Sequence, residues 1–146
     1  MKLVSDIMIK NPIICGPSTS LEHIASLMLN HNCGEITIVD SENRPIGVVT
    51  DRDICIRSLA LGKNPLSMRA IEIMSTPVVS VTPDASLDKS VALMELKLIR
   101  RLPVVDENGK CCGIISYSDI ARVADDALTS DMVFQLSRPT PIDYTH

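Results

Sequence analysis

The chain has 146 residues, a formal net charge of −4, 45% apolar residues and only 2% aromatic residues. A nucleic-acid partner is not expected, because an acidic chain with so few aromatic rings lacks the positive charge and the stacking surface that such binding uses. The apolar fraction excludes a disordered chain, and the length suits one compact unit or two small ones with an aliphatic core.

The first half of the chain predicts short strands around one clear amphipathic helix. After a lead-in over residues 1–11, Ser20 is predicted to cap a helix that begins with the periodic apolar residues Leu21 and Ile24. Residues that favour turns separate the other predicted elements, which are a strand at 13–15, strands at 36–39 and 46–49 around a turn at 40–44, a helix at 51–61 and a linker at 62–65.

The second half of the chain repeats this order. Its predicted elements are a lead-in at 72–74, a strand at 77–81, a helix at 87–98, strands at 102–105 and 114–115, and a helix from 117 to about 126. The turn between the last two strands contains Asn108-Gly109, a strong hairpin signal. The tail from Ser137, with Pro139 and Pro141, is expected to be irregular.

Residues 21–54 and 87–120 align without a gap, and eight of the 34 positions are identical. The identical pairs are Leu21/Leu87, Leu27/Leu93, Met28/Met94, Val39/Val105, Asp40/Asp106, Gly47/Gly113, Asp53/Asp119 and Ile54/Ile120. A duplicated β-α-β-β-α unit explains this most simply. Each copy is too small to bury both faces of its sheet, so we expect an α/β (α+β) fold in which two copies pack with approximate twofold symmetry. The predicted boundaries are 1–62 and 63–127 for the repeats and 128–146 for a C-terminal tail.

One motif occurs in both repeats, at residues 47–53 and 113–119. It reads glycine, two β-branched residues, a hydroxyl residue, two variable residues and aspartate. The β-branched pair suits a buried strand, and the hydroxyl can cap a helix that begins at the next residue. The aspartate three positions later falls on the same side of the first helical turn. The hydroxyl, the carboxylate and free helix N–H groups could then hold a ribose diol and a phosphate. Alternatively, Thr50/Asp53 and Ser116/Asp119 only cap their helices, as variants of the capping box.

The doubled features together resemble a tandem pair of cystathionine β-synthase-type (CBS) domains, or Bateman module, over about residues 5–126. The resemblance rests on the repeated Ile-Met lead-in, the Pro-apolar-apolar strand, the helices from Leu21 and Leu87, the apolar strands that end in Asp40 and Asp106, and the doubled motif. It implies a non-catalytic regulatory sensor that binds AMP, ADP, ATP, S-adenosylmethionine or a related adenosyl ligand between its repeats. It also implies an unidentified regulated protein as partner, and self-association into a homodimer.

The resemblance implies a set of ligand-binding residues. The ribose-binding aspartates of the family fall on Asp53 and Asp119, and its hydroxyl residues fall on Thr50 and Ser116. A basic residue near the phosphates would be supplied by Arg100-Arg101 in the second repeat, where the first repeat has Gly34-Glu35, and Arg52 could add charge beside the first motif. All three arginines could instead be solvated surface residues. The short strands would line an adenine pocket with Ile13, Ile14, Cys15, Val78, Val79 and Ser80.

Two other functions compete with ligand sensing. One is a purely structural dimerisation or protein-interaction module with empty clefts; apolar stripes on helices 21–29 and 87–98 favour a homodimer under either function. The other is a cysteine enzyme, which needs a histidine base beside the thiol, and no local pairing in the sequence suggests one. We therefore expect a protein that is not an enzyme and has no catalytic residues.

The five cysteines lie at positions 15, 33, 55, 111 and 112 and show no Cys-x-x-Cys spacing. Reduced thiols in a cytoplasmic protein are the simplest explanation. No apolar run approaches the roughly 18 residues of a membrane span, so no membrane association is expected. The histidines have no evident metal partners, and neither a metal site nor a resident cofactor is expected.

Overall fold

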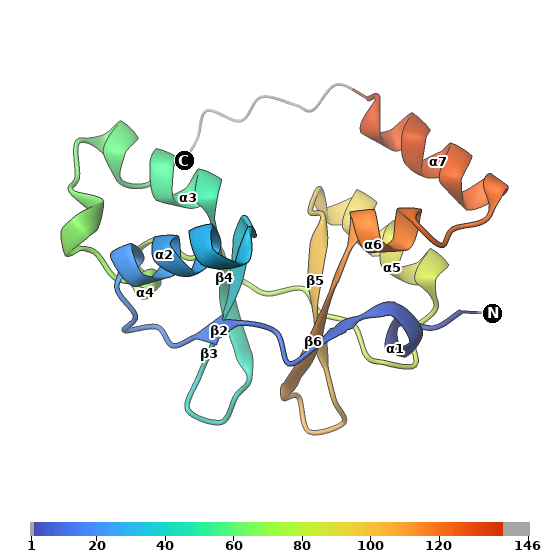
Figure 1. Ribbon diagram of the computed structural model, residues 1–146, viewed down its shortest axis with the longest axis horizontal. Coiled ribbons are helices and arrows are strands. Elements are labelled where there is room, and N and C mark those ends of the chain that lie inside the picture. Colours follow the sequence, from blue (N-terminus) through green and yellow to red (C-terminus); the bar gives the residue numbers. More distant parts are fainter. Residues whose placement is uncertain (1, 139–146) are drawn as a thin grey trace. The chain divides into compact units, whose positions relative to one another are not determined.

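The computed structural model describes residues 2–138, and it confirms the predicted α+β class (Figure 1). Its strands form two three-stranded sheets, with the orders β2-β3-β4 and β1-β6-β5. The chain divides into two compact units, which we name after the aspartate of the motif that each contains. The Asp53 unit comprises residues 13–79 and 108–111, and the described part of the Asp119 unit comprises residues 2–12, 80–107 and 112–138.

The sheet of the Asp53 unit has one parallel and one antiparallel strand pair. Strand β2 (Ile14–Cys15) runs parallel to β3 (Glu35–Val39), which pairs antiparallel with β4 (Pro45–Thr50). Alternation along the strands sends Ile36, Ile38 and Val49 to one face, where they pack in one core with the apolar side of α2 (Leu21–His31). Ser20 caps α2, since its Oγ accepts the N–H of His23 at 3.2 Å. The predicted strands, helix and cap of this region are confirmed.

The helix predicted at 51–61 is shorter than expected. Helix α3 covers Asp51–Ile56, and a separate 3₁₀ turn follows at Leu59–Leu61. The hydroxyl of Ser58 bonds to the carbonyl oxygen of Ile54, and serine side chains that bond to nearby backbone in this way compete with regular helix. Gly62, at φ 72°, then closes the 3₁₀ turn in a left-handed conformation that glycine adopts easily. A second 3₁₀ turn at Pro65–Ser67 and α4 (Ala70–Ile73) complete the unit.

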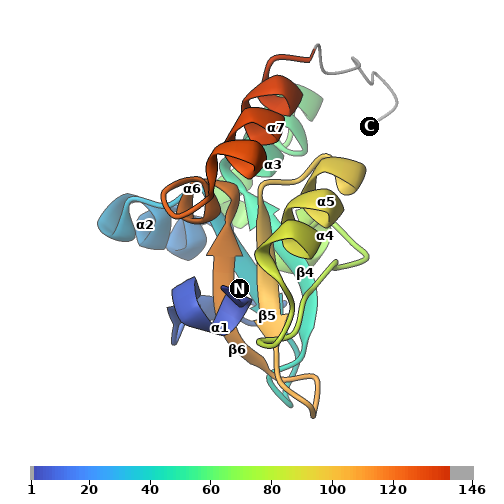
Figure 2. The same ribbon diagram turned by 90° about the vertical axis from the view of Figure 1, so that its right-hand side faces the viewer.

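The Asp119 unit is built on the same plan with one additional helix (Figure 2). Strand β6 (Cys111–Ser116) lies between β5 (Arg101–Val105) and the N-terminal strand β1 (Ile9–Lys10), which follows α1 (Val4–Ile7). Ser86 caps α5 (Leu87–Lys97) by accepting the N–H of Lys89 at 3.1 Å. The chain continues into α6 (Tyr117–Ala121) and α7 (Asp126–Leu136). The buried residues Val91, Met94, Leu102, Val104 and Ile115 contribute its aliphatic core.

The structure corrects two predicted elements of the second repeat. The strand predicted at 77–81 is reduced to a single bridge between Val81 and Val104. Pro103 precedes Val104 in β5 and has no N–H to donate to the predicted strand, whereas Thr37 stands at the corresponding position of the first repeat. The helix predicted from 117 to about 126 ends at Ala121, and α7 had no sequence prediction. Asp125 starts α7 by accepting the N–H of Leu128 at 2.8 Å.

Each unit combines the lead-in of one repeat with the body of the other. Residues 2–12 fold with the second repeat, and the lead-in around residues 70–75 folds with the first. Strand β1 shows the consequence, because Ile9 lies opposite Ile114 although 105 residues separate them in the chain. The isolated bridge between Ser75 and Val48 is its counterpart in the Asp53 unit, at positions shifted by 66 residues.

The helices in the described part of the chain are short. The longest of them, α2, α5 and α7, have 11 residues each. Within residues 2–138, none is long and apolar enough to cross a lipid bilayer.

Candidate functional site

The turn from β4 to α3 places the first predicted ribose site. Thr50 ends the strand and caps the helix, with its Oγ1 accepting the N–H of Asp53 at 2.9 Å. In return, Oδ2 of Asp53 accepts the N–H of Thr50 at 3.1 Å. The two side chains therefore form the reciprocal capping box that the spacing allowed, and they hold the carboxylate in one position at the strand's end.

The turn from β6 to α6 has the same construction. The N–H of Asp119 donates to Ser116 Oγ at 3.0 Å, and the N–H of Ser116 donates to Asp119 Oδ2 at 3.3 Å. Both turns thus present one aspartate at the same position relative to strand and helix. Capping accounts for one oxygen of each carboxylate, and the second oxygen, Oδ1, remains for other partners.

The glycine that opens each motif is required by close packing. A Cβ at Gly47 would lie 2.6 Å from Sδ and 2.9 Å from Cγ of Met74. A Cβ at Gly113 would lie 2.8 Å from Sδ of Met8 and 3.0 Å from the carbonyl oxygen of Ile9. In both units the methionine of the Ile-Met lead-in therefore packs directly on the motif glycine, which explains why these two parts of the repeat occur together.

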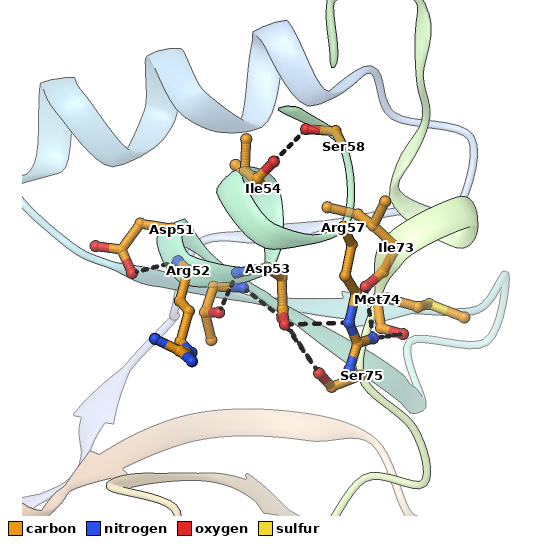
Figure 3. A network of polar contacts seen from close by, with 10 residues as sticks. Asp51, Arg52, Asp53, Ile54, Arg57, Ser58, Ile73, Met74 and Ser75 are labelled. Carbon is orange, nitrogen blue, oxygen red and sulfur yellow. Dashed lines mark hydrogen bonds and ion pairs between the residues drawn. The ribbon is translucent and has the colours of Figure 1, made fainter. Parts of the chain in front are cut away.

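Asp53 has further partners, which Figure 3 shows. The hydroxyl of Ser75 donates toward both of its carboxylate oxygens, at 3.3 Å from Oδ1 and 3.2 Å from Oδ2. Nε of Arg57 lies 3.7 Å from Oδ1. The same guanidinium also donates from Nη1 to the carbonyl oxygens of Ile73 at 3.0 Å and Met74 at 3.3 Å. Only 8% of the Asp53 side chain remains exposed.

Asp119 is more accessible and has fewer partners in the described chain. Its side chain is 17% exposed, and its Oδ1 accepts a bond from Nη1 of Arg122 at 2.8 Å. The side chain of Arg122 is itself 72% exposed. An exposed ion pair between residues three apart on a helix contributes little and is easily exchanged for water or a ligand. The carboxylate of Asp53 is therefore more buried and contacts more groups of the protein than the carboxylate of Asp119.

The predicted phosphate-binding arginines lie beside the second turn. Arg100 precedes β5, and its carbonyl oxygen accepts the N–H of Tyr117, the first residue of α6, at 2.8 Å. Arg100 is exposed and Arg101 is half-buried. At the matching place in the first repeat, the carbonyl oxygen of Gly34 accepts the N–H of Asp51 at 2.9 Å. The backbone is thus the same in both repeats, but only the second has guanidiniums there.

Arg52 and the predicted adenine-pocket residues occupy different environments. Arg52 is exposed on the first turn of α3. In β2, Ile14 is exposed, whereas Cys15 belongs to the core cluster beside α2, and its burial raises the pKa of its thiol. Val78 and Val79 are half-buried at the end of the Asp53 unit, and Ser80 begins the Asp119 unit. An adenine-binding role for these residues stays a prediction.

Tyr117 joins the second turn to the appended helix α7. Its buried hydroxyl lies 3.2 Å from Oε1 of Glu95 and 3.1 Å from the carbonyl oxygen of Met132. Burial, followed by the neighbouring Glu95 carboxylate, raises the pKa of Tyr117 to about 12. Burial also raises the pKa of Glu95. Because Tyr117 directly follows Ser116, α7 is fastened to the residue next to the predicted ribose site.

Sequence reasoning missed four of these residues. Arg57 and Arg122 stand four and three positions after an aspartate, a helical spacing that predicts an ion pair and could have been recognised. Ser75 contacts Asp53 across 22 residues of chain, and Tyr117 contacts Glu95 across the same separation, so neither contact had a local signal. Residues 2–138 contain no group of three or more histidine, cysteine, aspartate or glutamate side chains placed to hold a metal ion. None of the five cysteines, all of which lie within residues 2–138, forms a disulfide.

Comparison with known proteins confirms the resemblance. The family model named CBS domain matches residues 4–59 and again 70–126. Protein MK0525 of Methanopyrus kandleri is 40% identical over 120 residues, which cover 82% of this chain but only 61% of that protein.

Two solved structures of protein–ligand complexes are also similar to this chain. The CBS domain pair of protein MJ0100, in complex with 5′-methylthioadenosine and S-adenosyl-L-methionine, matches with a TM-score of 0.74 and 31% identity, covering 84% of this chain and 95% of that one. CBSX2 in complex with AMP matches with a TM-score of 0.72 and 25% identity, covering 90% and 99% of the two chains.

Proposed function

Since the chain belongs to the CBS domain family and carries it twice, we propose that it is a non-catalytic regulatory module for adenine nucleotides or related adenosyl ligands. The ligand class comprises AMP, ADP, ATP and S-adenosylmethionine, and the bound state is passed on to a partner protein. One observation carries the proposal. Both units end a strand in a hydroxyl-aspartate capping box, with matching bonds at positions 66 residues apart.

The chemistry of this turn suits a nucleoside. A carboxylate held at a fixed position can accept hydrogen bonds from both hydroxyls of a ribose, and hydrogen bonds to a charged acceptor are stronger than neutral ones. Arg100 and Arg101 stand beside the second turn, where they add the positive charge that an anionic nucleotide needs on an acidic protein. The adenosyl ligands of the MJ0100 pair and the AMP of CBSX2 support the same ligand class.

The competing function is a structural module without a ligand. Capping alone explains why the hydroxyl and the aspartate occur together, and Ser75 with Arg57 already satisfies Asp53. Capping does not require the paired arginines beside the less engaged Asp119. We therefore favour ligand binding. A cytoplasmic location is supported by five cysteines that form no disulfide.

A thermal-shift panel tests the proposal. Protein freed of carried-over nucleotide should melt at a higher temperature with at least one of adenosine, AMP, ADP, ATP, 5′-methylthioadenosine and S-adenosylmethionine, because a ligand of the native state stabilises it by mass action. Guanosine and GMP serve as matched controls for the adenine ring. If no adenosyl compound at millimolar concentration changes the melting temperature more than these controls, the structural function is supported instead.

We also propose that the protein forms a homodimer. Leu29, at the end of α2, is 81% exposed, and Leu96 and Leu98, at the end of α5, are 75% and 71% exposed. Large apolar side chains exposed on both units favour association that covers them. Light scattering at micromolar concentration should give about twice the 15.9 kDa chain mass, and Leu96→Glu or Leu98→Glu should lower it. A wild-type mass of one chain would contradict the proposal.

A further inference from the structure

Asp53 is engaged by residues outside its own turn, and these residues come from the lead-in of the other repeat and from the end of α3. Ser75 donates its hydroxyl at 3.2 Å and 3.3 Å from the two carboxylate oxygens, and Arg57 adds positive charge at 3.7 Å (Figure 3). A donor hydroxyl near both oxygens of a carboxylate makes the same kind of bond that a ribose hydroxyl would make. The predicted ribose acceptor of the Asp53 unit is therefore already occupied by a side chain of the protein.

The Asp119 unit lacks both of these groups. The residue that corresponds to Ser75 is Ile9, and the register supports this, since Ser75 lies opposite Val48 and Ile9 lies opposite Ile114. The residue that corresponds to Arg57 is Val123. Neither isoleucine nor valine has a side-chain donor, so the repeats that share the aspartate differ in what already binds it.

We infer that Ser75, supported by Arg57, is a built-in competitor for the ribose and sets the affinity of the Asp53 site below that of the Asp119 site. This inference rests on the proposed function, because it concerns the same ribose-binding carboxylates. For a ribose diol to bind Asp53, the hydroxyl of Ser75 must leave the carboxylate. At Asp119 a diol displaces only the exposed guanidinium of Arg122.

Displacement of Ser75 also has a structural consequence. Residues 73–75 are fastened to the Asp53 unit by Arg57, through the carbonyl oxygens of Ile73 and Met74, and by paired backbone bonds between Ser75 and Val48 at 2.8 Å and 3.1 Å. Directly after this segment, residues 76–79 lead the chain out of the unit. A ribose bound at Asp53 breaks the hydrogen bonds between the Ser75 hydroxyl and the carboxylate. Because Arg57 contacts both Asp53 and the carbonyl oxygens of residues 73 and 74, the ribose also affects the bonds that Arg57 makes to this segment. The site is thereby coupled to one of the segments through which the chain passes between the units. A ligand that binds the attached and detached states of this segment with different affinity can shift their populations.

Calorimetry with adenosine measures the competition directly, because adenosine has the ribose but no phosphate. The experiment uses Asp119→Ala protein, in which the Asp119 site is weakened and binding at the Asp53 site can be followed. Adding Ser75→Ala should tighten adenosine binding by about tenfold, the change expected when one competing bond to a charged acceptor is removed. Adding Ser75→Thr, which keeps a hydroxyl, should leave the affinity near that of the Asp119→Ala parent. Adding Asp53→Ala to the Ser75→Ala variant should abolish the gain.

The reciprocal variant is Ile9→Ser in the otherwise wild-type chain. It places a hydroxyl at the corresponding position beside Asp119 and should weaken adenosine binding at the tighter site. Melting curves confirm that each variant is folded.

Equal or weaker adenosine binding after Ser75→Ala, including no measurable binding while the wild type binds, would overturn the inference and leave the proposed function standing. Failure of the proposed function is a different result, in which the wild-type chain binds no adenosyl compound at all.

Discussion

Replacing Asp119 by alanine should weaken the tightest binding of both adenosine and AMP by about ten- to hundredfold. The expected range corresponds to the loss of one charge-assisted bond to the ribose, which contributes about 1.5–3 kcal/mol, and both ligands have the ribose. Asp119 is the candidate for the tighter site because it is the more exposed of the two aspartates and its Arg122 partner is solvated. Calorimetry with the two ligands gives both dissociation constants.

Two further variants identify which part of the ligand each residue binds. Arg101→Ala should weaken AMP by about tenfold and leave adenosine almost unchanged, because adenosine has no phosphate for a guanidinium to bind. Asp119→Asn keeps an oxygen that can accept the N–H of Ser116, so it separates the loss of charge from the loss of the helix cap.

Asp53→Ala is the matched control in the other repeat. It should leave the tightest binding intact and affect only a weaker event. If Asp53→Ala abolishes the tightest binding while Asp119→Ala preserves it, the assignment of the principal site is wrong.

The second large effect concerns stability. Gly47→Ala should lower the free energy of unfolding by about 1–3 kcal/mol, the usual cost of forcing an extra group into a packed interior. The new Cβ would lie 2.6 Å from Sδ, 2.9 Å from Cγ and 3.2 Å from Cβ of Met74, so a rotation of the methionine tip alone does not relieve the overlap. Urea unfolding followed by circular dichroism measures the change.

Gly16→Ala is the control for this substitution. No atom lies within 4 Å of a Cβ at Gly16, so the same chemical change should have little effect there. A double variant, Gly47→Ala with Met74→Ala, should be more stable than the sum of the two single changes predicts, because the smaller side chain removes the overlap. Strict additivity, or a Gly47→Ala protein as stable as the wild type, would contradict the packing of Met74 on the motif glycine.

Much of the fold and the central part of the candidate site were predictable from the sequence, because the signals are local. Leu21 and Leu87 begin helices capped by the preceding serines, and Thr50 and Ser116 cap the next helices through bonds that span three residues. Such signals depend on neighbours within one helical turn and therefore survive in the sequence. The recurrence of the motif at a spacing of 66 residues then identified two copies of one unit and, through their resemblance, the family.

Other features depended on contacts between distant parts of the chain. The second short strand is lost because Pro103 stands beside it. Helix α7 contacts the second turn through the bond between the Tyr117 hydroxyl and the carbonyl oxygen of Met132. The same holds for Ser75, which meets Asp53 only because the lead-in of the second repeat folds against the first, while Ile9 takes the corresponding place beside Ile114. The sequence by itself determined the two equivalent aspartates, since each is positioned by its own turn. Only the tertiary structure decided that they are unequal, because the groups that engage a carboxylate come from whichever segments fold around it.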